Sequence, residues 1–514
     1  MELNLKTIPI KDMAVLAKVT LPSEESSDIV VPDSLPDIIR IVETDARMEL
    51  RSKEVRGNKL YVEASVPVSV IYVPENGSGL CRLAITLPVS VVFDLEGMIG
   101  SDVQIVLDTD CLKANARELN PRKIAVRVTA NFHCTVYTVR ETHVCTAIDG
   151  DGVETLMTTH TVRLIDGIYE KNIGVTDSVE LPQGVTASAE ILKLESSIRT
   201  LEKKQIKNKV VLKGEMQVSM LFLEGEEQGR LKTADVVIPF AGVVDCIGVD
   251  EDSTTELSYT LGGADWKIVR ESGTDRSLLT AKLELQTLIL AWSERELTCV
   301  ADAYGTVQSL VCENEEICFV RAGGGTEIQQ TLRETISCGV PIRQIYLCTI
   351  RTENPTVQNS ENGVEVFVDG IVHLILEAED GGIYALTKSM VLSAPLENSD
   401  LVLQVAEISD KSYHINGGDT VEVRCRVTYR LQPNAGETIC QIRRADLLPI
   451  APAPTRTPAL TLCYANEGET LWDLGKRLGA AINDIRSANA LSGDDLPQGR
   501  ILLIPRTARE SGRM

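Results

Sequence analysis

Residues 59–72, KLYVEASVPVSVIY, form the stretch that decides the fold. Apolar residues alternate with polar or small ones over much of its length, which is the period of a half-buried β-strand. The turn sequence Pro74-Glu75-Asn76-Gly77 follows it, as at the end of a hairpin strand. Val, Ile, Leu and Thr abound before residue 449, and helical periodicity is scarce. The sequence therefore predicts a mainly β protein.

The same pattern recurs twice along the chain. It returns at residues 209–222, KVVLKGEMQVSMLF, and more weakly at residues 364–376, VEVFVDGIVHLIL. Ala64, Gly214 and Gly370 then line up at steps of about 150 residues, a period long enough for duplicated domains rather than a solenoid.

A second alternating strand lies late in each copy, at residues 124–130, 279–285 and 421–427. Each copy is therefore expected to pack several strands over one core. We predict three tandem β-sandwich-like domains, with a partly closed barrel as the alternative for each. The expected boundaries are 1–165, 166–315 and 316–448.

The C-terminal part differs in composition. Alternating prolines in residues 449–459 predict an extended, semi-rigid linker that holds the last domain away from the β domains. Residues 460–506 read as strand, helix, helix and strand, and residues 507–514 as a tail. Thr470 and Asp473 have the spacing of a capping box, and Gly479 suits the end of the first helix.

Within this βααβ segment, Gly468-Glu469-Thr470-Leu471-Trp472, Asn489 and Ile504-Pro505 have the order and spacing of a LysM module, which the segment resembles. The resemblance implies a shallow binding groove between two loops. Trp472, Leu474 and Ile485 are expected to be core residues. Glu469 replaces the usual Asp, and Ala481 forgoes a helix cap worth about 0.5–2 kcal/mol. The implied groove residues are Gly468, Glu469, Thr470, Leu471, Asn489, Ala490, Leu491 and Ser492.

The stretch Val31-Pro32-Asp33-Ser34-Leu35-Pro36-Asp37-Ile38 resembles the signature of the SPOCS domain of spore-coat-type proteins. Ile38, Ile39 and Val42 after it indicate a short helix packed on the sheet. SPOCS copies followed by one LysM resemble the SipL-like coat assembly proteins. That resemblance implies a protein of the mother-cell cytoplasm at the forespore surface and then of the spore coat. It also implies, as partners, the coat-basement ATPase SpoIVA and other coat proteins.

Charge and cysteine content narrow the partners and the compartment. Lys plus Arg total 51 against 74 Asp plus Glu, for a formal charge of −23, which makes nucleic acid and anionic membrane surfaces poor partners. The start MELNLKTIPIKDMAVLAKV lacks the pattern of a secretory signal, and no stretch is apolar enough for membrane insertion. Thirteen cysteines without a C-x-x-C pair suggest reduced thiols.

No motif for catalysis stands out. His133 and His143 flank Cys134 and Cys145 and invite a metal site, but the close cysteine pairs of structural zinc are missing. Nucleophile elbows and metalloprotease motifs are not found in the sequence either. We therefore expect no enzyme activity, no catalytic or metal-binding residue and no cofactor.

Three functions remain open from the sequence. The first is a non-enzymatic spore coat assembly protein that tethers coat components to the forespore surface through its LysM domain. The alternative is a peptidoglycan-binding protein of the cell wall or cortex, whose LysM holds N-acetylglucosamine-containing glycan. A wall hydrolase is the third, and the internal repeats weigh against it.

Overall fold

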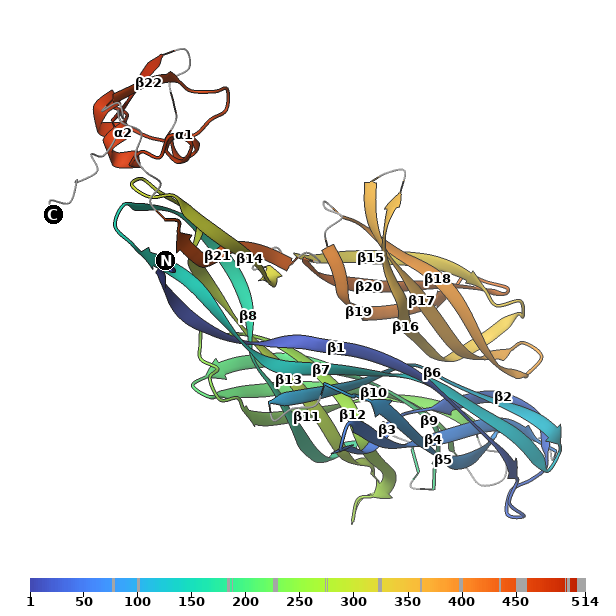
Figure 1. The fold of residues 1–514 in the computed structure, drawn as a ribbon. Helices are drawn as coiled ribbons and strands as arrows, with labels where there is room; N and C mark the ends of the chain where they lie inside the picture. The colour runs from blue at the N-terminus through green and yellow to red at the C-terminus, as the bar shows by residue number, and fades with distance from the viewer. Residues whose placement is uncertain are drawn as a thin grey trace.

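The computed structural model is dominated by antiparallel strands, with two short helices near the C-terminus (Figure 1). It describes residues 1–505 apart from 76–78, 99–101, 183–184, 187, 225–229, 273, 275, 322–325, 361–362, 397–400, 434–435, 450–459, 495 and 497–499. The predicted linker and the predicted tail at 507–514 lie outside the described residues, except for Pro449. The mainly β prediction is confirmed.

The first unit is a sandwich of two sheets. One sheet has β4 at its centre with β5 on one side and β2 and β3 in succession on the other, and the second has the order β1-β7-β6. Val66, Phe93 and Phe132 are completely buried between the two sheets. The strands are β1 (Asn4–Val30), β2 (Ile38–Ala46), β3 (Glu49–Arg56), β4 (Lys59–Pro74), β5 (Cys81–Asp94), β6 (Val103–Asn120) and β7 (Lys123–Asp149).

The second unit repeats this arrangement, with one sheet in the order β9-β10-β11 and the other in the order β8-β13-β12. Its core likewise lies between the sheets, around Val218, Ile238 and Leu283. The strands are β8 (Val153–Glu180), β9 (Glu190–Ile206), β10 (Lys209–Glu224), β11 (Arg230–Asp245), β12 (Thr254–Arg270) and β13 (Ser277–Gly305).

The third unit has the same connections, with sheets β16-β17-β18 and β15-β20-β19, and its core includes Leu374, Leu392 and Tyr429. The weakest of the three sequence copies thus folds as the other two do. The strands are β14 (Leu310–Arg321), β15 (Thr326–Ser337), β16 (Ile342–Ser360), β17 (Gly363–Ala378), β18 (Ile383–Leu396), β19 (Leu401–Ile415), β20 (Thr420–Pro433) and β21 (Gly436–Leu447).

The structure corrects the alignment of the third copy. The strands β4, β10 and β17 have 16 residues each and nearly the same burial pattern. By this pattern Val368, not Gly370, holds the position of Ala64 and Gly214. Matching glycine to glycine therefore shifts the third copy by two residues. The short helix expected at Ile38–Val42 is also wrong, since pairing with β4 makes residues 38–46 a strand.

Each unit sends a two-stranded arm beyond its sandwich. In the first two units the arm continues the first and last strands, and in the third it consists of the separate strands β14 and β21. Apolar residues from all six arm strands pack together, which joins the three units at this end. They are Ile10, Val144, Val162, Leu164, Leu297, Cys299, Phe319 and Ile439.

Two of the predicted domain boundaries fall inside strands that form the arms. The boundary after residue 165 lies inside β8, and that after residue 315 lies inside β14. A division that follows the strands changes units at residues 150–152 and 306–309 instead, between β7 and β8 and between β13 and β14. The alternating pattern does not distinguish the arm of a strand from its sandwich half.

A second junction joins the three units through β4, β10 and β17. Ile71, Leu221 and Ile375 hold the same position in these strands and point out of the sandwiches, yet each is at most 1% exposed. Each is buried against residues of a neighbouring unit, as where Leu221 packs with Leu347 and Ile375. An outward apolar residue recurring in all three copies therefore marks the contact between them.

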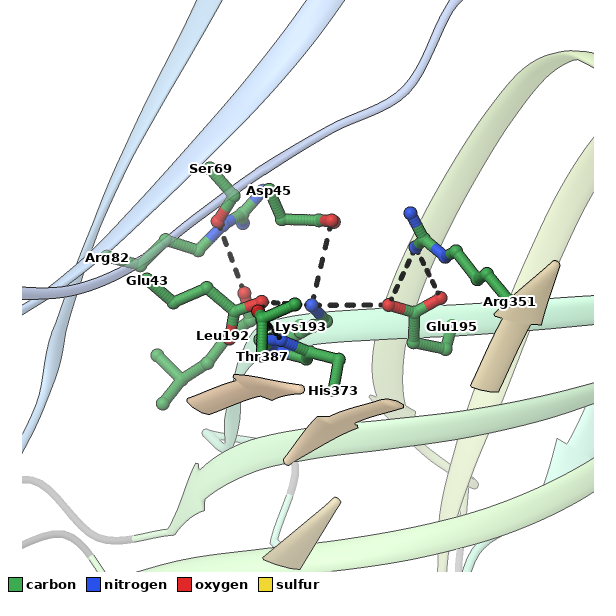
Figure 2. Close-up of polar contacts among 10 residues, drawn as sticks. All are labelled: Glu43, Asp45, Ser69, Arg82, Leu192, Lys193, Glu195, Arg351, His373 and Thr387. Carbon is green, nitrogen blue, oxygen red and sulfur yellow. Dashed lines mark hydrogen bonds and ion pairs between the residues drawn. The ribbon is translucent and has the colours of Figure 1, made fainter. Parts of the chain in front are cut away.

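Beside this apolar junction lies a cluster of charged residues from all three units (Figure 2). Lys193 of β9 is 3% exposed and forms an ion pair with Glu43 of β2. Its ammonium also lies 3.2 Å from Glu195, which pairs with Arg351 of β16 at 3.0 Å. His373 of β17 has Nε2 2.9 Å from Glu43. The cluster thus ties β2 of the first unit and β9 of the second to β16 and β17 of the third.

The C-terminal domain has the predicted order of strand, helix, helix and strand. Its elements are β22 (Leu460–Tyr464), α1 (Leu471–Leu478), α2 (Ile482–Asn489) and β23 (Ile501–Pro505). The two strands pair antiparallel, and one face of their sheet packs with the helices around Leu474, Ile485 and Leu502. Both helices of the described part have only eight residues, too few to cross a membrane.

Candidate binding site of the C-terminal domain

The start of α1 is fixed by local hydrogen bonds, as the sequence predicts. The Thr470 hydroxyl accepts from the backbone N–H of Asp473 at 3.2 Å, and the Asp473 carboxylate accepts from the backbone N–H of Thr470 at 3.1 Å. Hydrogen bonds from the Thr470 side chain and backbone lower the pKa of Asp473. Gly479 ends the helix in the left-handed conformation, with φ of 62°.

The second helix is capped less well. Ala481 at its N-cap makes no side-chain hydrogen bond, as its sequence implied. At the other end Ala490 adopts φ of 51°, a conformation that a residue with a Cβ rarely takes. The Leu491 N–H donates to the Arg486 carbonyl at 3.0 Å and holds this turn.

The two predicted groove loops lie side by side. The Leu471 N–H donates to the carbonyl of Asp494 at 3.2 Å, which joins the turn before α1 to the loop after α2. Arg486 adds an ion pair with Asp494 at 2.7 Å. The structure therefore brings both halves of the predicted site together.

Only part of the predicted set can reach a ligand. Gly468, Thr470, Ala490 and Ser492 are exposed on the two loops. Leu471 is completely buried with Leu474 in the domain core, because its side chain turns inward at the first position of α1. Leu471 is therefore a core residue rather than part of a groove surface, which corrects the prediction. Leu491 also packs, partly buried, against this core.

Asn489 supports the site without facing solvent. It is 4% exposed, and its side-chain amide donates to the carbonyls of Ile485 at 2.8 Å and Leu503 at 2.6 Å. Its side-chain oxygen accepts from the Leu503 N–H at 2.7 Å. Asn489 thus fixes α2 against β23 by pairing backbone groups that would otherwise be unsatisfied.

Glu469 is also engaged within the domain. Arg477 donates to its carboxylate through Nε at 2.7 Å and Nη2 at 2.9 Å, and the backbone N–H of Asn466 donates at 2.8 Å. These hydrogen bonds, led by that of Arg477, lower the pKa of Glu469. The Glu469 carboxylate therefore closes the loop before α1 through Asn466 and Arg477.

The C-terminal domain contacts the end of β13, which the sequence did not predict. The Trp472 Nε1–H donates to Asp302 at 3.0 Å, and Lys476 forms an ion pair with the same carboxylate at 2.6 Å. Tyr304 packs edge-on against Trp472 with ring centroids 4.9 Å apart, and its hydroxyl donates to the carbonyl of Ala480 at 2.8 Å.

This contact changes two expectations. Trp472 is buried as predicted, but against another unit as well as its own domain. The domain lies at the arm end of the molecule and touches the second unit, so it is not held away from the β units (Figure 1). Gly475 is a signal in the sequence that pointed to the contact. A glycine weakens the interior of a helix such as α1 by roughly 1 kcal/mol, so it suggests a close approach by another part of the chain. A Cβ at this position would overlap the Tyr304 hydroxyl.

The two cysteines suspected as metal ligands are buried in apolar cores, and His133 contacts a hydroxyl group. Cys134 is buried in the core of the first unit, and Cys145 in the arm junction. Burial raises the pKa of Cys134 to about 11. His133 contacts the Thr20 hydroxyl at 2.9 Å. The described part of the chain contains no group of three or more His, Cys, Asp or Glu side chains that could hold a metal ion.

Comparisons with known proteins agree with these units. Residues 37–117 and 189–269 match the family model described as SipL, SPOCS domain, and residues 466–505 match that of the LysM domain. Both are non-catalytic families. No curated protein and no solved structure matches the chain.

The matched SPOCS ranges run from the end of the turn before β2 to β6 in the first unit and from just before β9 to β12 in the second. The third unit lies outside the matched ranges but has the same strand connections. The chain therefore combines SPOCS domains with a C-terminal LysM domain, which is the architecture of SipL-type sporulation proteins.

Proposed function

We propose that this protein is a non-enzymatic assembly protein of the spore coat, which tethers coat components to the forespore surface through its LysM domain. One observation carries the proposal: the LysM domain is mounted on the joined arms through one side of α1, while the loop residues Gly468, Thr470 and Ser492 stay exposed. A binding module held in one orientation on a three-unit scaffold suits a tether.

The proposed partners are the coat-basement ATPase SpoIVA and other coat proteins, and the proposed location is the mother-cell side of the forespore. We expect such proteins to contact the edges or faces of the three β units. Removal of residues 460–506 is expected to abolish localisation at the forespore. The three β units should stay folded, because the LysM domain has a core of its own. Normal localisation of the truncated protein would contradict the tether.

Peptidoglycan binding is the second candidate, and the composition of the groove favours it. The exposed loop residues Gly468, Thr470, Ala490 and Ser492 offer backbone groups and hydroxyls without charge, which suits a neutral sugar chain.

One experiment separates the two candidates. The full chain and a chain ending at residue 449 are passed over immobilised recombinant SpoIVA and over insoluble peptidoglycan in parallel. Retention of the full chain on SpoIVA alone supports the tether, and retention on peptidoglycan alone moves the function to wall or cortex attachment. The shortened chain is the control and should be retained on neither.

A further inference from the structure

The outer face of the LysM sheet is apolar and uncovered. Leu460, Leu462 and Tyr464 of β22 are 49%, 60% and 58% exposed, and Ile501 and Leu503 of β23 are 47% and 37% exposed. Leu462 lies opposite Leu503 and Tyr464 opposite Ile501, so the five side chains form one continuous face. The helices cover only the other face. A contiguous apolar surface of this kind is typical of an interaction site.

The backbone of β22 is open along its outer edge. The N–H and carbonyl of Leu503 both bond to the Asn489 side chain, so they do not bond to β22. In an antiparallel ladder Leu462, directly opposite, then turns its own N–H and carbonyl away from β23. No hydrogen bond between described residues satisfies these groups of Leu462 from that side. The edge of β23 is thus capped by Asn489, whereas the edge of β22 is open.

This edge also lacks the usual protection against strand pairing. Proteins guard exposed edges with charged residues, prolines or bulges. Every described edge strand outside the LysM sheet carries at least one charged residue, such as Lys388 in β18 or Lys232 in β11. The sequence of β22, LTLCY, has neither charge nor proline, and its pairing has no bulge. The open edge is therefore a local exception in this chain.

The two segments that flank the LysM sheet in the sequence do not suit this edge in composition. Residues 450–459 end at β22, but Pro452, Pro454 and Pro458 lack the N–H groups that a ladder needs. Residues 506–514, RTARESGRM, carry three arginines and a glutamate, which do not match an apolar face. A second copy pairing through β22 would bring only five residues a side, against roughly 20–30 in a stable interface.

We propose that β22 binds an extended apolar segment of a different protein by strand addition, with side chains of the added strand continuing the Leu462–Leu503 face. The proposal rests on the proposed function, since it names the surface by which the LysM domain would hold a protein partner. Main-chain hydrogen bonds would supply affinity, and alternate side chains would supply specificity. Docking through α1 leaves β22 on the far side of the domain from the arms (Figure 1).

The test uses the full chain, with recombinant SpoIVA as the protein probe and insoluble peptidoglycan as the glycan probe. Leu462→Lys puts a charge on the face, and Leu462→Thr removes apolar surface while keeping a strand-forming residue. Ser487→Lys, on the exposed side of α2, is the matched control. We expect Leu462→Lys to weaken retention on SpoIVA at least tenfold and Leu462→Thr to weaken it less. Ser487→Lys should leave it unchanged.

Hydrogen exchange of the complex, read by mass spectrometry, supplies the second readout. Strand addition should slow exchange in residues 460–464. Undiminished retention of both Leu462 variants, or protection confined to residues 467–471, would overturn the inference but leave the tether standing. Retention of the unmodified chain on peptidoglycan alone, or on neither probe, would overturn the protein tether itself and the inference with it.

Discussion

Leu471 shows how a residue can be placed correctly along the chain and still be assigned the wrong role. Its backbone N–H lies between the two predicted groove loops, where it donates to the Asp494 carbonyl, but its side chain is completely buried. At the first position of a helix the side chain can face either the loop or the core. The motif spacing gives the position, whereas the apolar stripe of Leu471, Leu474 and Leu478 gives the side.

A charge at position 471 should therefore unfold the LysM domain rather than test its groove. Leu471→Arg puts an unpaired charge into the domain core, and loss of the leucine alone costs about 2–5 kcal/mol. We expect residues 460–505 to become sensitive to limited proteolysis while the β units stay resistant. Ser492→Arg is the matched change on the exposed loop, and it should weaken ligand retention without this sensitivity. Protease resistance of Leu471→Arg would show that the side chain can leave the core.

The residues whose roles are local were predictable, and those with distant partners were not. Thr470, Asp473 and Gly479 act within one helix, so their spacing alone specifies the cap. The roles of Asn489 and Trp472 depend on Leu503 and Tyr304, which are 14 and 168 residues away in the sequence. The motif identified both as important, but only the fold shows what each one contacts.

At the level of elements, the arms are the feature that the sequence concealed. The strand β7 has 27 residues with apolar residues along its whole length, although its first half lines a sandwich core and its second half, where Val144 and Cys145 break the alternation, lines the arm junction. Both settings need one apolar face, so they produce the same pattern. Gln441, 1% exposed, joins two arms by donating to the His143 carbonyl at 2.8 Å and accepting from the Cys145 N–H at 2.8 Å.

The helix α1 tests whether LysM docking depends on close approach. Gly475→Ala should raise helix propensity by about 1 kcal/mol, but its methyl group meets the Tyr304 hydroxyl. We expect the domain to stay folded and to detach from β13, with faster hydrogen exchange in residues 302–305 and a red shift of Trp472 emission. Gly493→Ala is the control, because nothing lies within 4 Å of the added carbon. An unchanged emission spectrum in both variants would mean that Tyr304 moves aside at little cost.

At the scale of the whole molecule, the three copies act as one body because each contributes to the same two junctions. The repeat could be recognised in the sequence, but the burial of Ile71, Leu221 and Ile375 could not, since an outward apolar residue also occurs on ordinary surfaces. The charged cluster was hidden for a related reason: its members come from β2, β9, β16 and β17, and each is an ordinary strand residue on its own.

Lys193 is the centre of this cluster, and its removal should loosen the junction. Lys193→Met leaves Glu43 and Asp45 without their cation, and breaking a buried pair in this way costs about 3–5 kcal/mol. We expect a lower urea midpoint and faster exchange in β2 and β9. Lys213→Met, which removes an exposed pair with Glu202, is the control and should change the midpoint little. Equal effects of the two changes would show that the cluster contributes no more than a surface pair.

The same cluster predicts a loss of stability in acid. Burial opposes ionisation of Glu43, but its contacts with His373 and Lys193 outweigh the burial and lower the pKa of Glu43 to about 2. The pKa of Glu195 is also lowered, because Lys193 and Arg351 outweigh its burial, whereas burial raises that of Asp45. A lowered folded-state pKa stabilises the protein above the unfolded value of 4.5, and this contribution is lost as the pH falls toward 2.

Glu43→Gln isolates this contribution from general acid unfolding. At pH 7 the variant should be less stable than the unmodified chain, because it loses the charge that pairs with Lys193. Between pH 4.5 and 2 the difference should shrink, since the Glu43 carboxylate of the unfolded chain then takes up a proton while that of the folded chain stays ionised, which favours unfolding of the unmodified chain. The difference in stability between the variant and the unmodified chain is measured by urea unfolding at pH 7 and pH 3. Glu118→Gln, at an exposed position, is the control. A difference that stays constant over this range would place the role of Glu43 in packing rather than in charge.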